Sequence, residues 1–305
     1  MPQLQKHEAT MMIARYKQAW WLGLLALMSC DVINPAEDIP GYIYVTEFRL
    51  TTSPGLHGSA SERITDVWLN VDGDFAGAYT LPALIPILGL GERELVLQAG
   101  IKENGINSTP DIYPYYNDFR LRLELRPNEV DTIRPTIRYS DFARFAFIED
   151  FESSSQIFQD VRLGRADQLQ ISNVEVFEGT ASGRIRLDSL NPVLEVATTV
   201  RFNDLIARDP RVFLELNYKS DVPVVFGIIG NQPGGLPINE VVRFEPGFLP
   251  RENWNKIYFN LSTLIIEANQ PEIQIVLQAF IPILDGSFSR TQADVWLDNI
   301  KLVHF

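Results

Sequence analysis

The sequence predicts an all-β protein in which a small antiparallel β-sandwich precedes a larger β jelly roll. Short runs rich in β-branched and aromatic residues recur along the chain, and Gly, Pro, Asn and Asp separate them. No long amphipathic helical pattern interrupts these runs. About 276 residues follow the N-terminal 29, which is more than one typical hydrophobic core holds and suits two domains in series.

Residues 42–140 form the first predicted domain. Residues 42–50 are β-branched and aromatic, and predict its first strand. The pair Asp72-Gly73 lies between two further β-type runs. It indicates a hairpin with a type I′ turn, because both central residues of that turn need a positive φ. Residues 94–99 predict another short strand.

The end of this domain carries its clearest alternation. Apolar and charged residues alternate strictly over residues 119–125, which predicts a strand with one buried and one solvated face. Residues 130–139 predict the last strand. Pro135 interrupts it, and since proline cannot donate a backbone hydrogen bond, this strand is expected near a sheet edge.

Residues 144–305 form the second predicted domain, after a boundary at residues 140–144. Many short strands with Gly and Pro turns over roughly 160 residues favour a double-sheet jelly roll. The predicted strands cover residues 145–151, 182–187, 212–218, 224–229, 256–261, 272–280 and 295–303. Each domain is expected to have a hydrophobic core of its own.

The N-terminus has the pattern of an export signal. Basic residues precede an apolar run at residues 19–27, which is too short to span a bilayer. The stretch Leu27-Met28-Ser29-Cys30 then resembles the lipobox of bacterial lipoproteins. The resemblance implies that residues 1–29 are cleaved, that Cys30 carries the lipid, and that residues 30–41 are a tether. Acidic residues in that tether are similar to those of surface lipoproteins of Bacteroidota.

This resemblance implies a location at the outer membrane, facing the cell surface, with the periplasmic face as the alternative. The membrane is then a partner through the lipid anchor. Charge limits the other partners. The chain has 39 acidic and 26 basic residues and a net charge of −13, which argues against nucleic acid and anionic lipid as electrostatic partners. Cys30 is the only cysteine, so no disulfide stabilises the fold.

The first domain resembles PEGA-like and transthyretin-like modules of envelope proteins. The resemblance rests on residues 71–77 (VDGDFAG) and residues 94–100 (ELVLQAG), with Thr80, Pro82 and Gly91 between them. It implies a positioning or binding role.

An aromatic cluster follows these motifs. Tyr113, Tyr115 and Tyr116 are candidates for a contact patch with a partner or glycan. The alternative is that these rings close the core beneath a loop.

The second domain resembles galactose-binding-like jelly rolls, which include many carbohydrate-binding modules. The motifs are residues 148–152 (IEDFE), 254–257 (WNKI) and 295–300 (VWLDNI). The resemblance implies pairing of the first and last strands and a structural calcium ion held by Glu149 or Glu152 and Asp298. These acids are alternatively solvated strand ends.

The same resemblance makes Trp254 and Trp296 candidates for glycan contact. Their aromatic rings offer faces on which sugars stack. Alternatively, both rings belong to the hydrophobic core.

No catalytic motif stands out. Apart from the signal, the histidines are His57 and His304, and neither lies near a nucleophile motif. No required cofactor is predicted. The favoured function is a non-catalytic scaffold or binding subunit beside an outer-membrane β-barrel complex. The alternative is a glycan-binding lipoprotein for polysaccharide capture, and the weaker alternative is a carbohydrate-active enzyme.

Overall fold

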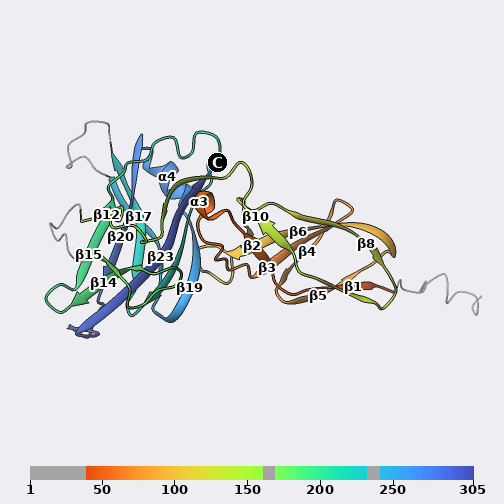
Figure 1. The fold of residues 1–305 in the computed structure, drawn as a ribbon, viewed down its shortest axis with the longest axis horizontal. Helices are drawn as coiled ribbons and strands as arrows, with labels where there is room; N and C mark the ends of the chain where they lie inside the picture. Colours follow the sequence, from red (N-terminus) through yellow and green to blue (C-terminus); the bar gives the residue numbers. More distant parts are fainter. Residues whose placement is uncertain (1–38, 161–168, 232–240) are drawn as a thin grey trace, which may run out of the picture.

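Two β-sandwiches lie end to end along the long axis of the molecule (Figure 1). This arrangement is seen in a computed structural model that describes residues 39–160, 169–231 and 241–305. The predicted all-β class is confirmed, and most strand pairs are antiparallel. The predicted signal, Cys30 and most of the tether lie outside the described residues. Within the described ranges, no helix is long and apolar enough to cross a membrane.

The first sandwich contains strands β1 to β10. Its five-stranded sheet comprises β3 (Asp66–Val71), β4 (Asp74–Thr80), β6 (Gly91–Lys102), β7 (Pro110–Ile112) and β8 (Phe119–Leu125). A three-stranded sheet comprises β5 (Ala83–Ile87), β1 (Gly41–Val45) and β9 (Val130–Ile133), in that order. Strands β2 (Arg49–Thr51) and β10 (Thr136–Arg138) form a separate parallel pair. The short helix α3 (Pro54–His57) follows β2.

Several local predictions for this domain hold, but two predicted strands are divided: residues 42–50 form β1 and β2, and residues 130–139 form β9 and β10. Asp72 and Gly73 connect β3 to β4 with φ values of 52° and 91°, as the type I′ turn requires. Burial along β8 alternates as its sequence predicts. Pro135 separates β9 from β10, and β9 lies at the edge of its sheet.

The second sandwich packs two larger sheets face to face. The first contains β13 (Leu169–Ser172), β14 (Ser182–Asp188), β23 (Gln292–His304), β16 (Val212–Ser220) and β19 (Arg251–Asn260) in order, with β11 (Arg144–Glu149) also paired to β23. The second contains β12 (Phe158–Gln159), β15 (Val193–Thr198), β20 (Glu272–Phe280), β17 (Val224–Asn231) and β18 (Val241–Phe248). A small hairpin joins β21 (Ile283–Leu284) to β22 (Ser287–Phe288). The antiparallel pairing of β11 with β23 confirms the expected pairing of first and last strands.

Sequence reasoning missed the short helices α3 and α4 (Ser262–Ala268) and the strands β5, β7, β12, β13, β15, β18, β21 and β22. Helix α4 has only seven residues, which is too short to display a helical period in sequence. Its buried residues, Leu264, Ile265 and Ala268, attach it to the core of the second sandwich.

The core of the first sandwich extends onto the second. It includes Phe213 on β16, Tyr258 on β19 and Val303 on β23, all of which are buried. Tyr113 contacts two of these rings, with centroid distances of 5.4 Å to Phe213 and 4.9 Å to Tyr258. The core of the first sandwich therefore includes side chains from both domains. The sequence predicts that residues 42–140 and 144–305 fold independently, but this shared core favours cooperative unfolding of the two sandwiches instead.

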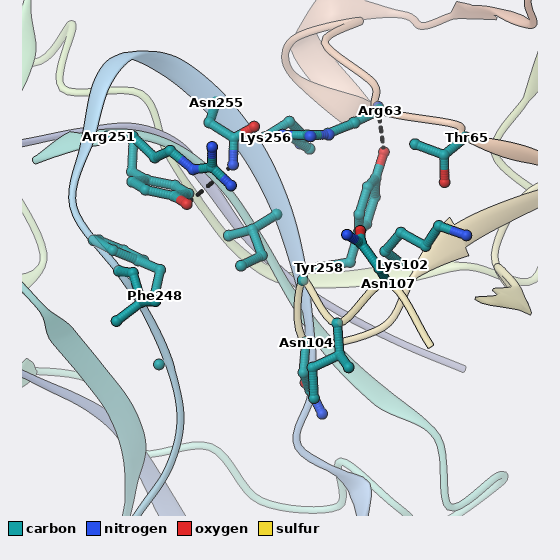
Figure 2. A pocket seen from close by; sticks show the side chains of 16 residues that line it. Arg63, Thr65, Lys102, Asn104, Asn107, Phe248, Arg251, Asn255, Lys256 and Tyr258 are labelled. Atoms are coloured by element: carbon teal, nitrogen blue, oxygen red, sulfur yellow. Dashed lines mark hydrogen bonds between the residues drawn. The ribbon is translucent and has the colours of Figure 1, made fainter. Parts of the chain in front are cut away.

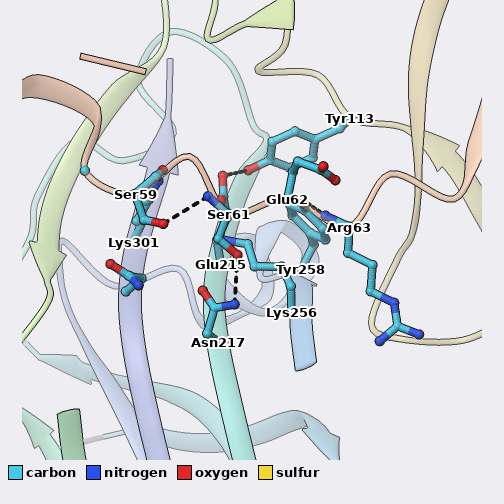
Figure 3. Close-up of polar contacts among 12 residues, drawn as sticks. Ser59, Ser61, Glu62, Arg63, Tyr113, Glu215, Asn217, Lys256, Tyr258 and Lys301 are labelled. Carbon is cyan, nitrogen blue, oxygen red and sulfur yellow. Dashed lines mark hydrogen bonds and ion pairs between the residues drawn. The ribbon is translucent and has the colours of Figure 1, made fainter. Parts of the chain in front are cut away.

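A buried ionic cluster lies within this junction (Figure 3). Glu215 on β16 is fully buried and lies opposite Lys301 of β23, which is also fully buried. Lys256 of β19 forms an ion pair with Glu215, with 2.9 Å between Nζ and Oε2. Lys301 donates a hydrogen bond of 2.7 Å to the carbonyl oxygen of Ser59 in the first sandwich.

Two tyrosines of the first sandwich complete the cluster. Tyr113 donates to Glu215 Oε1 at 2.6 Å, and the Tyr139 hydroxyl lies 2.8 Å and 2.9 Å from the two carboxylate oxygens. Hydrogen bonds to charged groups are stronger than neutral ones, and a buried carboxylate without them is costly. The first sandwich therefore supplies hydroxyl donors to a buried carboxylate on the second.

We expect Glu215→Gln to destabilise the protein by about 3–5 kcal/mol, because it leaves Lys256 buried without a counter-charge. Urea unfolding followed by circular dichroism measures this change. Glu129→Gln is the matched control. It breaks an exposed ion pair with Arg126 and should cost less than about 1 kcal/mol. Equal effects of the two substitutions would contradict the role assigned to the cluster.

Candidate functional site

A pocket of about 290 Å³ lies at the junction of the two sandwiches (Figure 2). We call it the junction pocket. Its first wall comes from residues 63–65 and from the end of β6 with the loop that follows. Its second wall comes from β16, the turn between β18 and β19, and β19 itself. The lining residues are Arg63, Thr65, Lys102, Asn104, Gly105, Ile106, Asn107, Tyr218, Gly247, Phe248, Leu249, Arg251, Asn255, Lys256, Ile257 and Tyr258.

The lining is positively charged. It contains four cationic side chains, and none of the sixteen lining residues is Asp or Glu. Two of the cations have partners behind the wall: Lys102 pairs with Asp66 at 2.8 Å, and Lys256 pairs with Glu215 at 2.9 Å. These two carboxylates neutralise two of the four cations, so the lining has a net charge of two positive units. This net charge belongs to the exposed side chain of Arg63 and to Arg251.

Amide and aromatic side chains form much of the remaining lining. Phe248 stacks on Tyr218 with a centroid distance of 3.8 Å and an interplanar angle of 14°. Asn255 donates to the Tyr218 hydroxyl at 3.0 Å, which fixes the orientation of its amide. Asn104 accepts from the backbone N–H of Asn260 at 2.9 Å. The pocket therefore presents oriented amides, and the stacked aromatic pair beneath them is itself buried.

The buried cluster sets the electrostatics of the wall behind Lys256. Burial alone would raise the pKa of Glu215, but the charges of Lys256 and Lys301 hold that pKa below its usual value. Burial lowers the pKa of Lys301 to about 7, against the attraction of Glu215. One carboxylate therefore faces two amines. Lys256 forms the direct ion pair with Glu215, whereas Lys301 donates to the carbonyl oxygen of Ser59.

A second cavity of about 490 Å³ also lies at the junction. Asp111, Asp118 and Arg211 are among its lining residues. The guanidinium of Arg211 already forms an ion pair of 2.7 Å with Asp209. This cavity therefore lacks the unpaired cations of the junction pocket.

The structure corrects the prediction of an exposed aromatic contact patch. Tyr113, Tyr115 and Tyr116 are buried in the shared core and contact the second sandwich of the same chain. Burial raises the pKa of all three hydroxyls. The alternative, a cluster that closes the core, describes their position. Their exposed fractions are 1%, 0% and 7%, so they form no exposed patch, although Tyr113 and Tyr116 line part of the second cavity.

The predicted tryptophans lie on the sheet that carries β16. Trp296 on β23 is buried, and the Arg184 guanidinium lies 4.5 Å from its ring. Trp254 on β19 is partly exposed and donates to Glu175 Oε1 at 3.2 Å. Glu175 also pairs with Lys219, the residue opposite Trp296 on β16. Trp254 is therefore linked to β16 through Glu175, and neither indole lines the junction pocket.

The two acids at the start of the second domain accept backbone hydrogen bonds. Glu149 accepts from two N–H groups at 2.9 Å and 2.8 Å, and burial raises its pKa. Glu152 accepts from the hydroxyl and N–H of Thr180, which lower its pKa, and from one further N–H group. Glu149 therefore fixes the segment that follows it, and Glu152 ties that segment to residues 180–181.

Asp298 has a similar role near the end of the chain. Three backbone N–H groups lie 2.8 Å, 3.2 Å and 3.3 Å from its carboxylate oxygens. Burial nevertheless raises its pKa to about 7. Among the described residues, no three His, Cys, Asp or Glu side chains form a group that could hold a metal ion. A calcium ion at Glu149, Glu152 and Asp298 remains a prediction that this geometry does not favour.

Sequence reasoning missed Arg63 and Arg251. Each lies in or beside a connecting segment without local periodicity, and the two are 188 positions apart in the sequence. Only the packing of the two sandwiches brings them to one pocket. An unpaired arginine has no signature in a single sequence, so no sequence signal could have selected this pair.

Comparison with known proteins finds likeness only among solved structures. A family 30 carbohydrate-binding module is 12% identical, with a TM-score of 0.38, over 52% of this chain and 99% of that one. A carbohydrate-binding module of the β-sandwich superfamily is 12% identical, with a TM-score of 0.34, over 78% and 85%. A xylan-binding domain of family 22 is 10% identical, with a TM-score of 0.34, over 54% and 97%. At these TM-scores, the likeness carries no argument about function.

No protein-family model matches the sequence, and no curated protein matches it. The function must therefore be argued from the site.

We expect Lys301→Met to change how stability varies with pH. The pKa of Lys301 is near 10.5 when unfolded and about 7 when folded. As the pH falls between these values, the unfolded chain binds the proton first. The wild-type fold should lose up to about 1.4 kcal/mol per pH unit from this group.

Urea unfolding at pH 7, 8 and 9 tests this expectation. The stability of wild type relative to Lys301→Met should rise with pH across this series. Lys219→Met, which alters a partly exposed lysine, is the control. A difference between wild type and Lys301→Met that stays constant with pH would contradict the lowered pKa.

Proposed function

We propose that this protein is a non-catalytic, glycan-binding lipoprotein that holds a sugar in the junction pocket. The observation that carries the proposal is the lining of this pocket, which combines amides, free guanidinium groups and an aromatic pair. Sugars present many hydroxyl groups, each of which donates and accepts hydrogen bonds. Asn107 is exposed. Together with Asn104 and Asn255, it supplies amide groups that can donate hydrogen bonds to such a ligand and accept them from it.

The size of the pocket suits one or two sugar rings rather than a broad protein surface. Small-molecule sites begin at about 300 Å³, close to the volume of 290 Å³ here. A stable protein interface buries about 1,600 Å² in total. The pocket therefore supports the glycan-binding alternative more directly than the scaffold that we favoured from sequence.

The chemistry of the lining supports binding rather than cleavage. Glycoside hydrolysis uses two carboxyl groups on opposite sides of the scissile bond. No Asp or Glu belongs to the lining of the junction pocket. A sugar held there meets cations and amides, which orient it without protonating its glycosidic oxygen in the manner of a glycosidase.

The outer end of the first sandwich supports the proposed membrane anchor. The described chain begins there, a few residues after Cys30 (Figure 1). Ile39, Leu88, Leu90 and Val130 are each at least 41% exposed, and β-sheet pairing places them around this end. Exposed aliphatic side chains suit a surface that rests against lipid. The junction pocket lies at the opposite end of the first sandwich, so it would then be held at a distance from the membrane.

The scaffold remains the competing function, although the tyrosines proposed as its contact patch are buried. It predicts a stoichiometric protein partner after gentle detergent extraction of the outer membrane. Recovery of such a partner, together with failure of the purified protein to bind any polysaccharide, would favour the scaffold over the glycan binder.

Affinity electrophoresis of the purified mature chain in gels that contain neutral or acidic polysaccharides tests glycan binding. We expect retardation by at least one polysaccharide. Asn107→Ala should weaken binding about 3-fold to 10-fold, the loss expected for one hydrogen bond of about 0.5–1.5 kcal/mol. Asn203→Ala removes an exposed amide that does not line the pocket, and it should bind as the wild type does. Equal binding by both variants would place the sugar elsewhere.

Substitution of the proposed lipid-attachment residue tests the anchor. Cys30→Ala should move the protein from the membrane fraction to the soluble fraction or block its processing, because no other cysteine can accept the lipid. Fractionation and gel mobility measure both effects. Unchanged membrane association with an unchanged mature band would contradict a lipoprotein.

A further inference from the structure

We infer that the junction pocket selects an anionic sugar, whose carboxylate or sulfate group binds between Arg63 and Arg251. This inference rests on the proposed glycan-binding function and specifies the ligand class of the same site. Three observations carry it: the position of the two guanidinium groups, the carboxylates that neutralise the other two cations of the pocket, and the net negative charge of the whole chain.

The second sandwich holds the segment that carries Arg63. The backbone N–H of Arg63 donates to the Tyr258 hydroxyl at 3.0 Å. Two residues earlier, Ser61 accepts a hydrogen bond of 2.8 Å from Asn217. Ser59 is held by Lys301 through its carbonyl oxygen. The backbone at Arg63 is therefore fixed, and its exposed side chain extends into the pocket.

Arg251 enters from the opposite wall. It is the first residue of β19 and lies opposite Ser220 of β16. Figure 2 shows its side chain directed toward the space that Arg63 also enters, with Asn255 at the same wall. Within the described part of the chain, neither guanidinium has an ion pair or a side-chain hydrogen bond. Each retains its full set of donors for a ligand.

The other two cations of the pocket serve a different purpose. Lys102 is neutralised by Asp66, and the buried Lys256 by Glu215. They line the wall without adding net charge. The positive excess is thus confined to Arg63 and Arg251, although the whole chain carries a net charge of −13. A neutral sugar would need no such excess, and a cationic ligand would be repelled by it.

The planar guanidinium group fits this role for geometric reasons. Its N–H donors match the paired oxygens of a carboxylate and form two parallel hydrogen bonds. Two such groups that approach from different domains can bind the same anion from two sides. The fixed amides of Asn104 and Asn255 then remain for the neutral hydroxyls of the ring.

A matched pair of polymers tests the inference. Polygalacturonate and highly methyl-esterified pectin share a backbone and differ chiefly in whether the carboxylate is charged. Dextran sulfate and dextran form the corresponding pair for sulfate. We expect the wild-type mature chain to bind one charged polymer at least tenfold more tightly than its neutral counterpart, with a preference that weakens as salt is raised.

Variants assign the preference to the pocket. Arg63→Ala and Arg251→Ala should each lose about tenfold or more in affinity for the preferred charged polymer, as expected for hydrogen bonds to a charged group. The double variant should bind charged and neutral polymers alike. Arg→Lys substitutions keep the charge but lose the planar fork, and should fall between wild type and Ala. The controls Arg134→Ala and Arg208→Ala remove exposed arginines that do not line the pocket.

The outcomes separate the inference from the proposed function. Preference for a charged polymer, lost in the Arg63 and Arg251 variants but kept in both controls, supports the inference. Equal binding of charged and neutral polymers would overturn it and leave glycan binding intact. Equal losses in the control variants would also overturn it, because the charge effect would then be general. Binding to none of the four polymers would overturn both the inference and the proposed function.

Discussion

The arrangement of the whole molecule depends on how the charge of Glu215 is satisfied. This carboxylate lies fully buried on β16 of the second sandwich, with Lys256 as its ion-pair partner. Its hydroxyl donors, Tyr113 and Tyr139, come from the first sandwich. A docking geometry that displaced these hydroxyl groups while keeping Glu215 buried would leave its carboxylate short of hydrogen-bond donors, which is costly. The polar cluster thereby selects one docking geometry, while the surrounding apolar contacts supply most of the burial.

The same docking geometry creates the junction pocket. Tyr258 contributes to the shared core, and its hydroxyl accepts the backbone N–H of Arg63. Lys256 contributes to the ionic cluster and also lines the pocket. Neither sandwich carries the pocket by itself, since Arg63 belongs to one and Arg251 to the other. A binding site of this kind depends on the rigidity of the domain junction more than on either sheet.

The sequence was informative where structure is local. The turn at Asp72-Gly73, the alternation in β8 and the effect of Pro135 follow from backbone sterics and the period of two residues. The candidate site was not predictable in the same way, because the packing of distant segments decides it. The tyrosines at residues 113–116 look alike in sequence whether they lie at a surface or in a core. The packing of Glu215 against their hydroxyl groups identifies the core position. A single sequence does not reveal that an acidic residue on a strand is buried.

The central claim is that the buried cluster couples the two sandwiches into one cooperative unit that builds the pocket. Differential scanning calorimetry of the mature chain with Cys30→Ala, which removes the lipid, tests it most directly. The account predicts a single transition in which the calorimetric and van't Hoff enthalpies agree. Two separate transitions, each with the enthalpy expected for one sandwich, would contradict it.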